Sequence, residues 1–353
     1  MSRSVLIMAG GTGGHIFPAL AVADQLRERG WTIVWLGSKA GMESTLVPQH
    51  GYEIEWLRFS GLRGKGVVRA LLLPLNLLIA FWQAARVIFR RRPDVVLGMG
   101  GYVSFPGGMM AAFLARPLVL HEQNAVSGLA NKVLSMVADR ILVAFPDALK
   151  NAQWTGNPVR REIAQLPAPE VRFRHRDGSL NVLVIGGSLG AQILNETVPR
   201  ALALIEQSQR PQVTHQAGAK HLAALEAAYR AAGVSAITRA FIVDMAQAYA
   251  AADVVICRAG ALTVSELAAA GVASVLVPLP SAVDDHQSVN ARYLAGQSAA
   301  ILLPQSELTP GKLAELLLGF TREKLLDMAS RARALGKPDA ARVVAEHCVA
   351  LAA

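Results

Sequence analysis

Cysteine is scarce in this chain of 353 residues, which contains only Cys257 and Cys348. An apolar stretch surrounds each of them. Two isolated cysteines exclude a disulfide framework and a cysteine-rich metal site, because both need several cysteines at short spacings. The chain is therefore expected to hold two reduced, packed thiols, as is typical of a cytoplasmic protein.

Long hydrophobic runs are also missing. The N-terminal run SVLIMAGG is too short for a signal peptide and leads directly into a glycine turn, so it predicts a first strand. The most apolar stretch, residues 70–85, is interrupted by Pro74, Asn76 and Gln83. It is shorter than the roughly 20 residues that a membrane-spanning helix needs. The sequence thus indicates no transmembrane segment.

Acidic residues are absent between Arg58 and Arg92, a segment that contains eight basic residues and nearly the whole net charge of +9. Within it, Leu71, Leu75, Leu78 and Trp82 recur at helical spacing. An apolar face flanked by cations predicts that segment 69–92 lies on an anionic membrane surface. A buried core helix with a solvated basic end fits the periodicity equally well, but the charge clustering favours the membrane. Nucleic acid is not expected, because interleaved aromatics and a recognition-helix pattern are lacking.

Three glycine-rich turns follow apolar runs that are typical of buried parallel strands: GGTGGH at 10–15, GMGGY at 98–102 and GGSLG at 186–190. Glycines allow backbone N–H groups to approach an anion, and the helix that follows adds the positive end of its dipole. Two of these phosphate loops lie in the first half of the chain and one in the second. The sequence therefore predicts two dinucleotide-fold domains that both bind phosphate.

Length and composition agree with two α/β domains, since 353 residues with 52% hydrophobic side chains can fill two cores. We predict an N-terminal domain over 1–160, a C-terminal domain over 161–335, and a last helix over 336–353 that could pack back on the first domain. The proline-rich stretch 157–179 is interpreted as the interdomain connection. The first helix is expected to begin at Pro18 and to end at Gly30, and a strand of the second domain is expected near Phe241.

The stretch CRAGALTVSELAAAG in the second half allows two interpretations. Gly260 makes a turn before a helix whose N-terminus suits a diphosphate, and Glu266 could accept hydrogen bonds from a ribose. Alternatively, Thr263 and Glu266 have the spacing of a capping box and need no ligand. The local pattern alone favours the capping box, because helix caps are far commoner than nucleotide sites.

The order and wording of the motifs closely resemble the MurG family of bacterial peptidoglycan glycosyltransferases over essentially the whole chain. The matching motifs are GGTGGH, SGLRGKG, GMGGY, HEQN, GNPVR, GGSLG and ALTVSE, in that order. The resemblance implies a GT-B fold, with two Rossmann-like doubly wound domains that face a cleft. It also implies a peripheral enzyme at the cytoplasmic face of the bacterial inner membrane.

The resemblance further implies the reaction. The family transfers N-acetylglucosamine from UDP-N-acetylglucosamine to the 4-hydroxyl of the N-acetylmuramoyl-pentapeptide of lipid I, with inversion of the anomeric centre, and makes lipid II. Both substrates are diphosphates, which explains the duplicated phosphate loops.

By the same resemblance, two groups of residues bind the substrates. The donor residues are expected to be Thr12, Gly13, Gly14, Asn124, Arg160, Ser188, Ile242, Ala261, Leu262, Thr263, Val264, Ser265, Glu266 and Gln287. The acceptor diphosphate is expected to contact Gly13, Gly14, Gly100, Gly101 and Tyr102. Of these, Ile242 would bind the uracil through its backbone, Glu266 the ribose, and Gln287 the sugar hydroxyls.

A base must remove the proton from the attacking hydroxyl. His15, at the end of the first glycine loop, is the candidate, since an imidazole with a pKa of about 6.5 suits this role. Its alternative role is to cap the helix or to bind a phosphate. Glu122, in HEQN, is the second candidate base. No DxD-type acidic pair stands out, so we expect neither a metal ion nor another cofactor.

Two rival functions fit less well. A nucleotide-dependent oxidoreductase would need a strict GxGxxG loop and an acidic residue after the strand TIVWLGS, and both are missing. A non-catalytic membrane scaffold would not need the set of polar residues expected to line the cleft.

Overall fold

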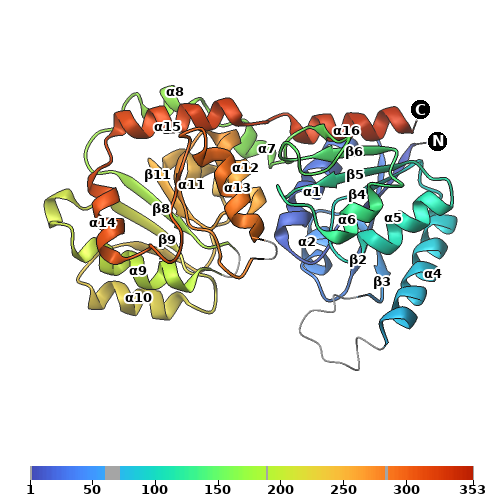
Figure 1. Ribbon diagram of the computed structural model, residues 1–353, viewed down its shortest axis with the longest axis horizontal. Helices are drawn as coiled ribbons and strands as arrows, with labels where there is room; N and C mark the ends of the chain where they lie inside the picture. The colour runs from blue at the N-terminus through green and yellow to red at the C-terminus, as the bar shows by residue number, and fades with distance from the viewer. Residues whose placement is uncertain (1, 60–71, 188–189, 283–284, 353) are drawn as a thin grey trace. The chain divides into compact units, whose positions relative to one another are not determined.

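The computed structural model describes residues 2–59, 72–187, 190–282 and 285–352. The chain divides into two compact units (Figure 1). Unit 1 consists of Met1–Arg160 together with Asp339–Ala353, and unit 2 consists of Arg161–Pro338. Each unit contains one parallel β-sheet covered by helices.

The sheet of unit 1 has the order β3-β2-β1-β4-β5-β6-β7. Its strands are β1 (Ser4–Met8), β2 (Thr32–Ser38), β3 (Glu53–Leu57), β4 (Val95–Gly98), β5 (Leu118–Glu122), β6 (Arg140–Val143) and β7 (Gln153–Trp154). Its helices are α1 (Gly13–Glu28), α2 (Glu43–Gln49), α4 (Leu73–Arg91), α5 (Ser104–Phe113), α6 (Leu129–Leu134) and α16 (Ala340–Leu351). The central strands are Val- and Leu-rich because helices cover both of their faces.

Two hydrophobic clusters lie on the two sides of this sheet. One contains Ile16 of α1 together with Val344 and Cys348 of α16, so the last helix of the chain belongs to the core of unit 1. The other contains Val87 and Ile88 of α4. The inner face of α4 is thereby fixed to the sheet, and its outer face is left for other contacts.

The sheet of unit 2 has the order β10-β9-β8-β11-β12-β13. Its strands are β8 (Asn181–Ile185), β9 (Gln212–Gln216), β10 (Ile237–Arg239), β11 (Val254–Cys257), β12 (Ala273–Leu276) and β13 (Ile301–Leu302). Its α-helices are α7 (Arg161–Ala164), α8 (Pro169–Phe173), α9 (Gln192–Ala203), α10 (Leu222–Ala231), α11 (Met245–Ala251), α12 (Ala261–Ala270), α13 (His286–Ala295), α14 (Pro310–Leu318) and α15 (Arg322–Leu335).

Each sheet has a switch point, where the chain leaves two neighbouring strands toward opposite edges. It lies between β1 and β4 in unit 1 and between β8 and β11 in unit 2. Ligands of doubly wound folds bind in the crevice at the carboxyl ends of such strands. The three predicted phosphate loops follow β1, β4 and β8, so all three lie at a switch point.

Several sequence predictions need correction. The first helix begins at Gly13 and not at Pro18, which lies inside it. The stretch 157–179 is not a plain connection, because it forms α7 and α8 and buries Phe173 in the core of unit 2. The strand expected near Phe241 is β10, which ends at Arg239, so Phe241 itself lies in the following loop. The two-residue strands β7 and β13 were missed because they are too short to show a periodic pattern.

Candidate active site

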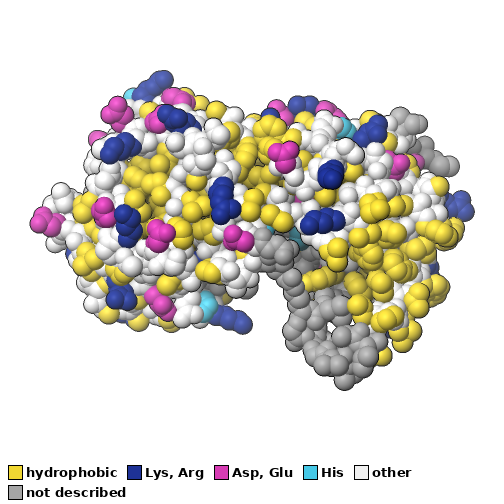
Figure 2. All heavy atoms as spheres, viewed as in Figure 1, with side chains coloured by type: hydrophobic (Ala, Val, Ile, Leu, Met, Phe, Trp, Pro, Cys, Tyr) yellow, Lys and Arg dark blue, Asp and Glu magenta, His cyan; other side chains and the backbone are white. Residues whose placement is uncertain are grey.

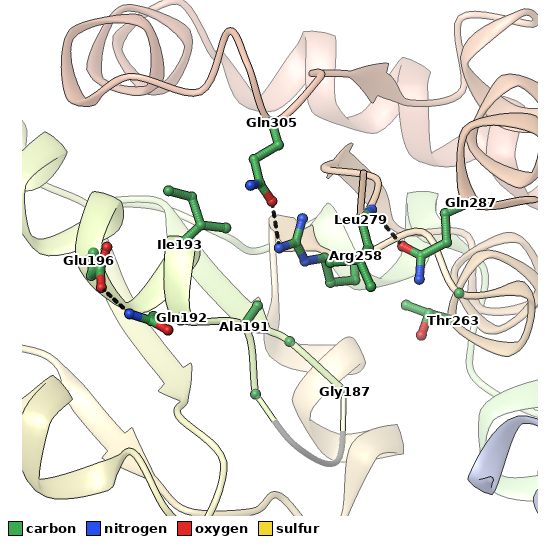
Figure 3. Close-up of a pocket in the computed structure, with 13 residues that line it drawn as sticks. Gly187, Ala191, Gln192, Ile193, Glu196, Arg258, Thr263, Leu279, Gln287 and Gln305 are labelled. Carbon is green, nitrogen blue, oxygen red and sulfur yellow. Dashed lines mark hydrogen bonds between the residues drawn. The ribbon is translucent and has the colours of Figure 1, made fainter. Parts of the chain in front are cut away.

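A pocket of about 640 Å³ lies in unit 2 at the carboxyl ends of β8 and β11 (Figure 3). Its lining includes the glycine loop after β8, the first residues of α9, and Gly260 and Thr263 at the start of α12. The N-terminal ends of two helices therefore border one pocket. Because unpaired N–H groups and the positive dipole end favour anions, this geometry suits a phosphate group.

The glycine loop after β8 depends on the small size of Gly190. Its φ is +79°, and a Cβ atom at this position would lie 1.8 Å from the carbonyl oxygen of Ala217, at the end of β9. Only glycine therefore allows the loop to lie this close to the neighbouring strand. Ser188, which the resemblance assigns to the diphosphate, lies outside the described residues.

The start of α12 excludes the capping-box interpretation. The N-cap is Gly260, which offers no side-chain hydrogen bond, and Thr263 lies within the first turn. The N–H of Val264 donates to Gly260 at 2.9 Å, and the N–H groups that precede it have no partner within the helix. They are available to an anion, whereas the N–H of Val264 is engaged within the helix and its side chain is fully buried.

Sequence reasoning missed Arg258, a cation in the lining of this pocket. Its guanidinium donates to Pro278 at 3.0 Å and to the Gln305 side chain at 2.8 Å, as Figure 3 shows for Gln305. Burial lowers the pKa of Arg258. Its position directly before the predicted turn at Gly260 was the available signal. Gln287, which was predicted, accepts a hydrogen bond from the backbone of Leu279 at 3.0 Å on another wall of the pocket.

Two other predicted donor residues do not line the pocket directly. Glu266 is buried and accepts a hydrogen bond from the hydroxyl of Tyr249 at 3.1 Å. The N–H of Ile242 donates to the side chain of Gln216 at 3.3 Å, and the amide nitrogen of Gln216 donates to Gly187 at 2.8 Å. Gln216 thus links the residue expected to bind uracil to the glycine loop.

In unit 1, the loops after β1 and β4 touch each other. A Cβ atom on Gly101, whose φ is +84°, would lie 2.3 Å from the carbonyl oxygen of Gly10. A second contact fixes the first loop. The buried carboxylate of Glu43 accepts from the N–H of Gly11 in this loop and from the N–H of Ser38 at the end of β2, both at 2.9 Å. The chain thereby brings together the two loops that the resemblance assigns to the acceptor diphosphate.

The HEQN motif ends β5 beside these loops. Glu122 is buried, and its carboxylate accepts from the backbone N–H of Asn124 at 2.9 Å and from the side chain of Asn131 at 2.7 Å. A carboxylate saturated in this way orients its neighbours and is poorly placed to accept a proton. The half-buried His15 contacts the side chain of Gln123 at 2.9 Å, which leaves His15 as the better candidate base.

The remaining predicted residues of unit 1 lie near these loops. The guanidinium of Arg160 lies 5.4 Å from the centre of the Phe17 ring, on the same helix as His15. Tyr102, at the end of the second loop, is exposed. In the part of the chain that the structure describes, no three His, Cys, Asp or Glu side chains gather into a possible metal site.

Comparison with known proteins agrees with this architecture. The N-terminal domain of glycosyltransferase family 28 matches residues 5–143, and the C-terminal domain of that family matches residues 181–344. The UDP-N-acetylglucosamine–N-acetylmuramyl-(pentapeptide) pyrophosphoryl-undecaprenol N-acetylglucosamine transferase of Cupriavidus metallidurans is 63% identical over 99% of both chains. The protein of the same name from Dechloromonas aromatica is 61% identical over 100% of both chains.

Among solved structures, the crystal structure of Acinetobacter baumannii MurG matches with a TM-score of 0.85 and 42% identity over 99% of both chains. Together with the two parallel α/β sheets, this match confirms the predicted GT-B fold class. The chain therefore belongs to glycosyltransferase family 28 and, within it, to the MurG family.

Proposed function

We propose that this protein transfers N-acetylglucosamine from UDP-N-acetylglucosamine to the 4-hydroxyl of the muramyl sugar of lipid I, with inversion, and makes lipid II. The observation that carries this proposal is the presence of phosphate-binding geometry in both units. Unit 2 has a pocket bordered by two helix N-termini and Arg258. Unit 1 has two touching glycine loops beside His15. A transferase with two diphosphate substrates needs both.

The donor occupies the pocket of unit 2 in this proposal. The N–H groups at the start of α12 bind the diphosphate and stabilise the charge that UDP gains as it leaves. Gln287 binds the sugar hydroxyls. The acceptor diphosphate lies against the glycine loops of unit 1, and the 4-hydroxyl of the muramyl sugar is directed at His15.

The direct test measures transfer of labelled N-acetylglucosamine to a short-chain, water-soluble lipid I analogue. Product formation with UDP-N-acetylglucosamine, and no binding of NAD or NADP, is the expected result. Absence of transfer by protein that melts cooperatively would contradict the proposal. Binding of a nicotinamide dinucleotide in place of UDP would support an oxidoreductase instead.

Glu266→Ala is expected to weaken UDP binding by about 1.5 to 3 kcal/mol, the range for a hydrogen bond to a charged group. Titration calorimetry with UDP measures this change, and a thermal melt of the same variant measures stability. The expectation rests on Glu266 accepting hydrogen bonds from the ribose.

Tyr249→Phe is the matched control, because it removes the hydroxyl that donates to Glu266 at 3.1 Å and keeps the carboxylate. We expect Tyr249→Phe to retain UDP affinity. If both variants lower the melting temperature and neither changes UDP affinity, Glu266 has only a structural role.

The outer face of α4 supports peripheral attachment to a membrane. Leu75, Leu78 and Trp82 are 55%, 65% and 62% exposed, although they are large and apolar. Figure 2 shows hydrophobic side chains gathered over the region that α4 and α5 occupy in Figure 1. Such a contiguous apolar surface marks an interaction site. Among the described residues, no helix has the length and apolar character needed to cross a bilayer.

Fewer cations of segment 69–92 are free to bind anionic lipids than the sequence predicted. Residues 69–71 of this segment lie outside the described residues. Arg90 pairs with Glu55, and Arg91 pairs with both Glu53 and Glu55. Both acids belong to β3, which lies outside the segment, so the charge of the segment alone did not indicate this pairing. Arg86, whose guanidinium lies 5.7 Å from the Trp82 ring centre, is better placed to meet anionic lipid head groups.

Replacing Leu75, Leu78 and Trp82 together with Ser is expected to weaken binding to anionic vesicles at least about 100-fold, since each buried apolar side chain contributes about 1.5 to 3 kcal/mol. Vesicle sedimentation measures binding, and turnover of the water-soluble acceptor should stay unchanged. Leu204→Ser with Leu318→Ser is the control, because these residues of unit 2 are 62% and 51% exposed. Equal vesicle binding by the two variants would place the attachment site elsewhere.

A further inference from the structure

Four groups of unit 1 form a chain of hydrogen bonds that ends at His15. The Nε2 atom of His121 lies 2.9 Å from the carbonyl oxygen of Gly156. The Nδ1 atom of His121 lies 3.1 Å from the amide nitrogen of Gln123. The amide oxygen of Gln123 lies 2.9 Å from Nδ1 of His15. His121 and Gln123 are buried, so water does not compete for the contacts between them.

The direction of each hydrogen bond follows from the Gly156 end of the chain. A carbonyl oxygen can only accept, so Nε2 of His121 carries the hydrogen. Burial lowers the pKa of His121 to about 4, and the ring is therefore neutral at pH 7. A neutral imidazole has one donor and one acceptor. Nδ1 of His121 is thus the acceptor, and it receives a hydrogen bond from the Gln123 amide.

A second contact fixes the orientation of the Gln123 amide. Its nitrogen also donates to the backbone carbonyl of His121 at 3.2 Å. A flipped amide would place its oxygen against this carbonyl and against Nδ1 of His121, which are both acceptors. The amide oxygen therefore faces His15, and Nδ1 of His15 must donate to it.

We propose that Gln123 is a positioning residue that holds His15 in the Nδ1–H tautomer and so leaves Nε2 of His15 as the proton acceptor for the attacking hydroxyl. An imidazole without such a partner carries its proton mainly on Nε2. Nε2 then has no free lone pair and cannot accept the proton of the hydroxyl. Among the described residues, Nε2 of His15 has no hydrogen-bond partner. The inference rests on the proposed function, because it assigns the acceptor atom of the proposed base.

The second glycine loop leaves space for this arrangement. A Cβ atom on Gly100, whose φ is +91°, would lie 2.6 Å from Nδ1 of His15 and 3.3 Å from the amide oxygen of Gln123. Any larger residue at position 100 would therefore displace the hydrogen bond between His15 and Gln123. This steric role is independent of any contact between Gly100 and a phosphate.

Two variants of Gln123 separate a tautomer effect from a general packing effect. Gln123→Glu keeps both contacts when its buried carboxyl is protonated, because the hydroxyl can donate to Nδ1 of His121 and the carbonyl oxygen can accept from Nδ1 of His15. Gln123→Leu fills a similar volume and can neither donate nor accept. Long-range ¹H–¹⁵N spectra of histidine-labelled protein report which ring nitrogen carries the proton. The His15 signals are assigned by their loss in His15→Gln, and spectra are recorded at pH 8.

We expect the Nδ1–H tautomer in the wild type and in Gln123→Glu, and a shift toward Nε2–H in Gln123→Leu. We also expect Gln123→Leu to lower kcat about 10- to 100-fold, less than the about 10² to 10⁴ typical of a lost general base, because His15 itself is kept. KM for UDP-N-acetylglucosamine should stay unchanged within about twofold. Gln123→Glu should keep kcat within about tenfold of the wild type. Incorrect tautomers have comparable or larger effects in serine proteases.

An Nε2–H tautomer of His15 in the wild type would overturn the inference. So would an unchanged tautomer in Gln123→Leu, because a loss of kcat would then reflect packing. The spectra need no substrate, so a protein without transferase activity that still showed the Nδ1–H tautomer would contradict the proposed function alone. If Gln123→Leu does not fold, the wild type and Gln123→Glu decide the question.

Discussion

His15→Ala is expected to lower the turnover of the lipid I analogue by about 10² to 10⁴, the contribution typical of a general base. The affinity for UDP-N-acetylglucosamine should be nearly kept, because His15 is not among the residues expected to bind the donor. Folding should also be kept, since the His15 side chain is only half-buried. Steady-state kinetics with both substrates, together with UDP calorimetry, measure these effects.

His50→Ala is the matched control, because His50 is an exposed histidine of the same unit. We expect it to have wild-type turnover. If His15→Ala raises KM for the acceptor and keeps kcat, His15 is a phosphate ligand and not the base. Full activity of His15→Ala would exclude both roles.

The positions of the phosphate loops could be predicted because the signal for each is local. A glycine cluster that directly follows an apolar run, as Gly10 and Gly11 follow β1, lies at the carboxyl end of a strand in any doubly wound fold. The two-unit division has a similar local origin, since a new apolar strand and glycine loop begin at Asn181. Such patterns need no knowledge of distant contacts.

Roles that depend on distant partners could not be predicted in the same way. Glu122 has the residue type and motif of a candidate base, but its hydrogen bond to Asn131 is visible only in the folded chain. Arg90 and Arg91 form part of a cationic run in the sequence, yet β3 supplies acids that pair with them. Arg258 lies two residues before the predicted turn at Gly260. Its place in the pocket lining, where it donates to Gln305, depends on a residue that is distant in the sequence.

Gly101→Ala tests whether the contact between the two loops of unit 1 is needed for acceptor turnover. The new Cβ atom would lie 2.3 Å from the carbonyl oxygen of Gly10, so the loops must separate by about 1 Å to reach ordinary contact. A displacement of this size can reduce a rate about 100-fold. We therefore expect kcat/KM for the acceptor to fall at least about 100-fold, with UDP affinity unchanged.

Gly51→Ala separates this contact from backbone strain. Gly51 has a φ of +77°, close to the +84° of Gly101, but no described atom lies within 4 Å of a Cβ atom at this position. Both variants carry the strain of a left-handed alanine, about 1 to 2 kcal/mol, which urea denaturation measures. Only Gly101→Ala forces the loops apart, so only this variant should lose acceptor turnover. Equal losses of stability and equal activities in the two variants would show that turnover does not depend on the close approach of Gly101 to Gly10.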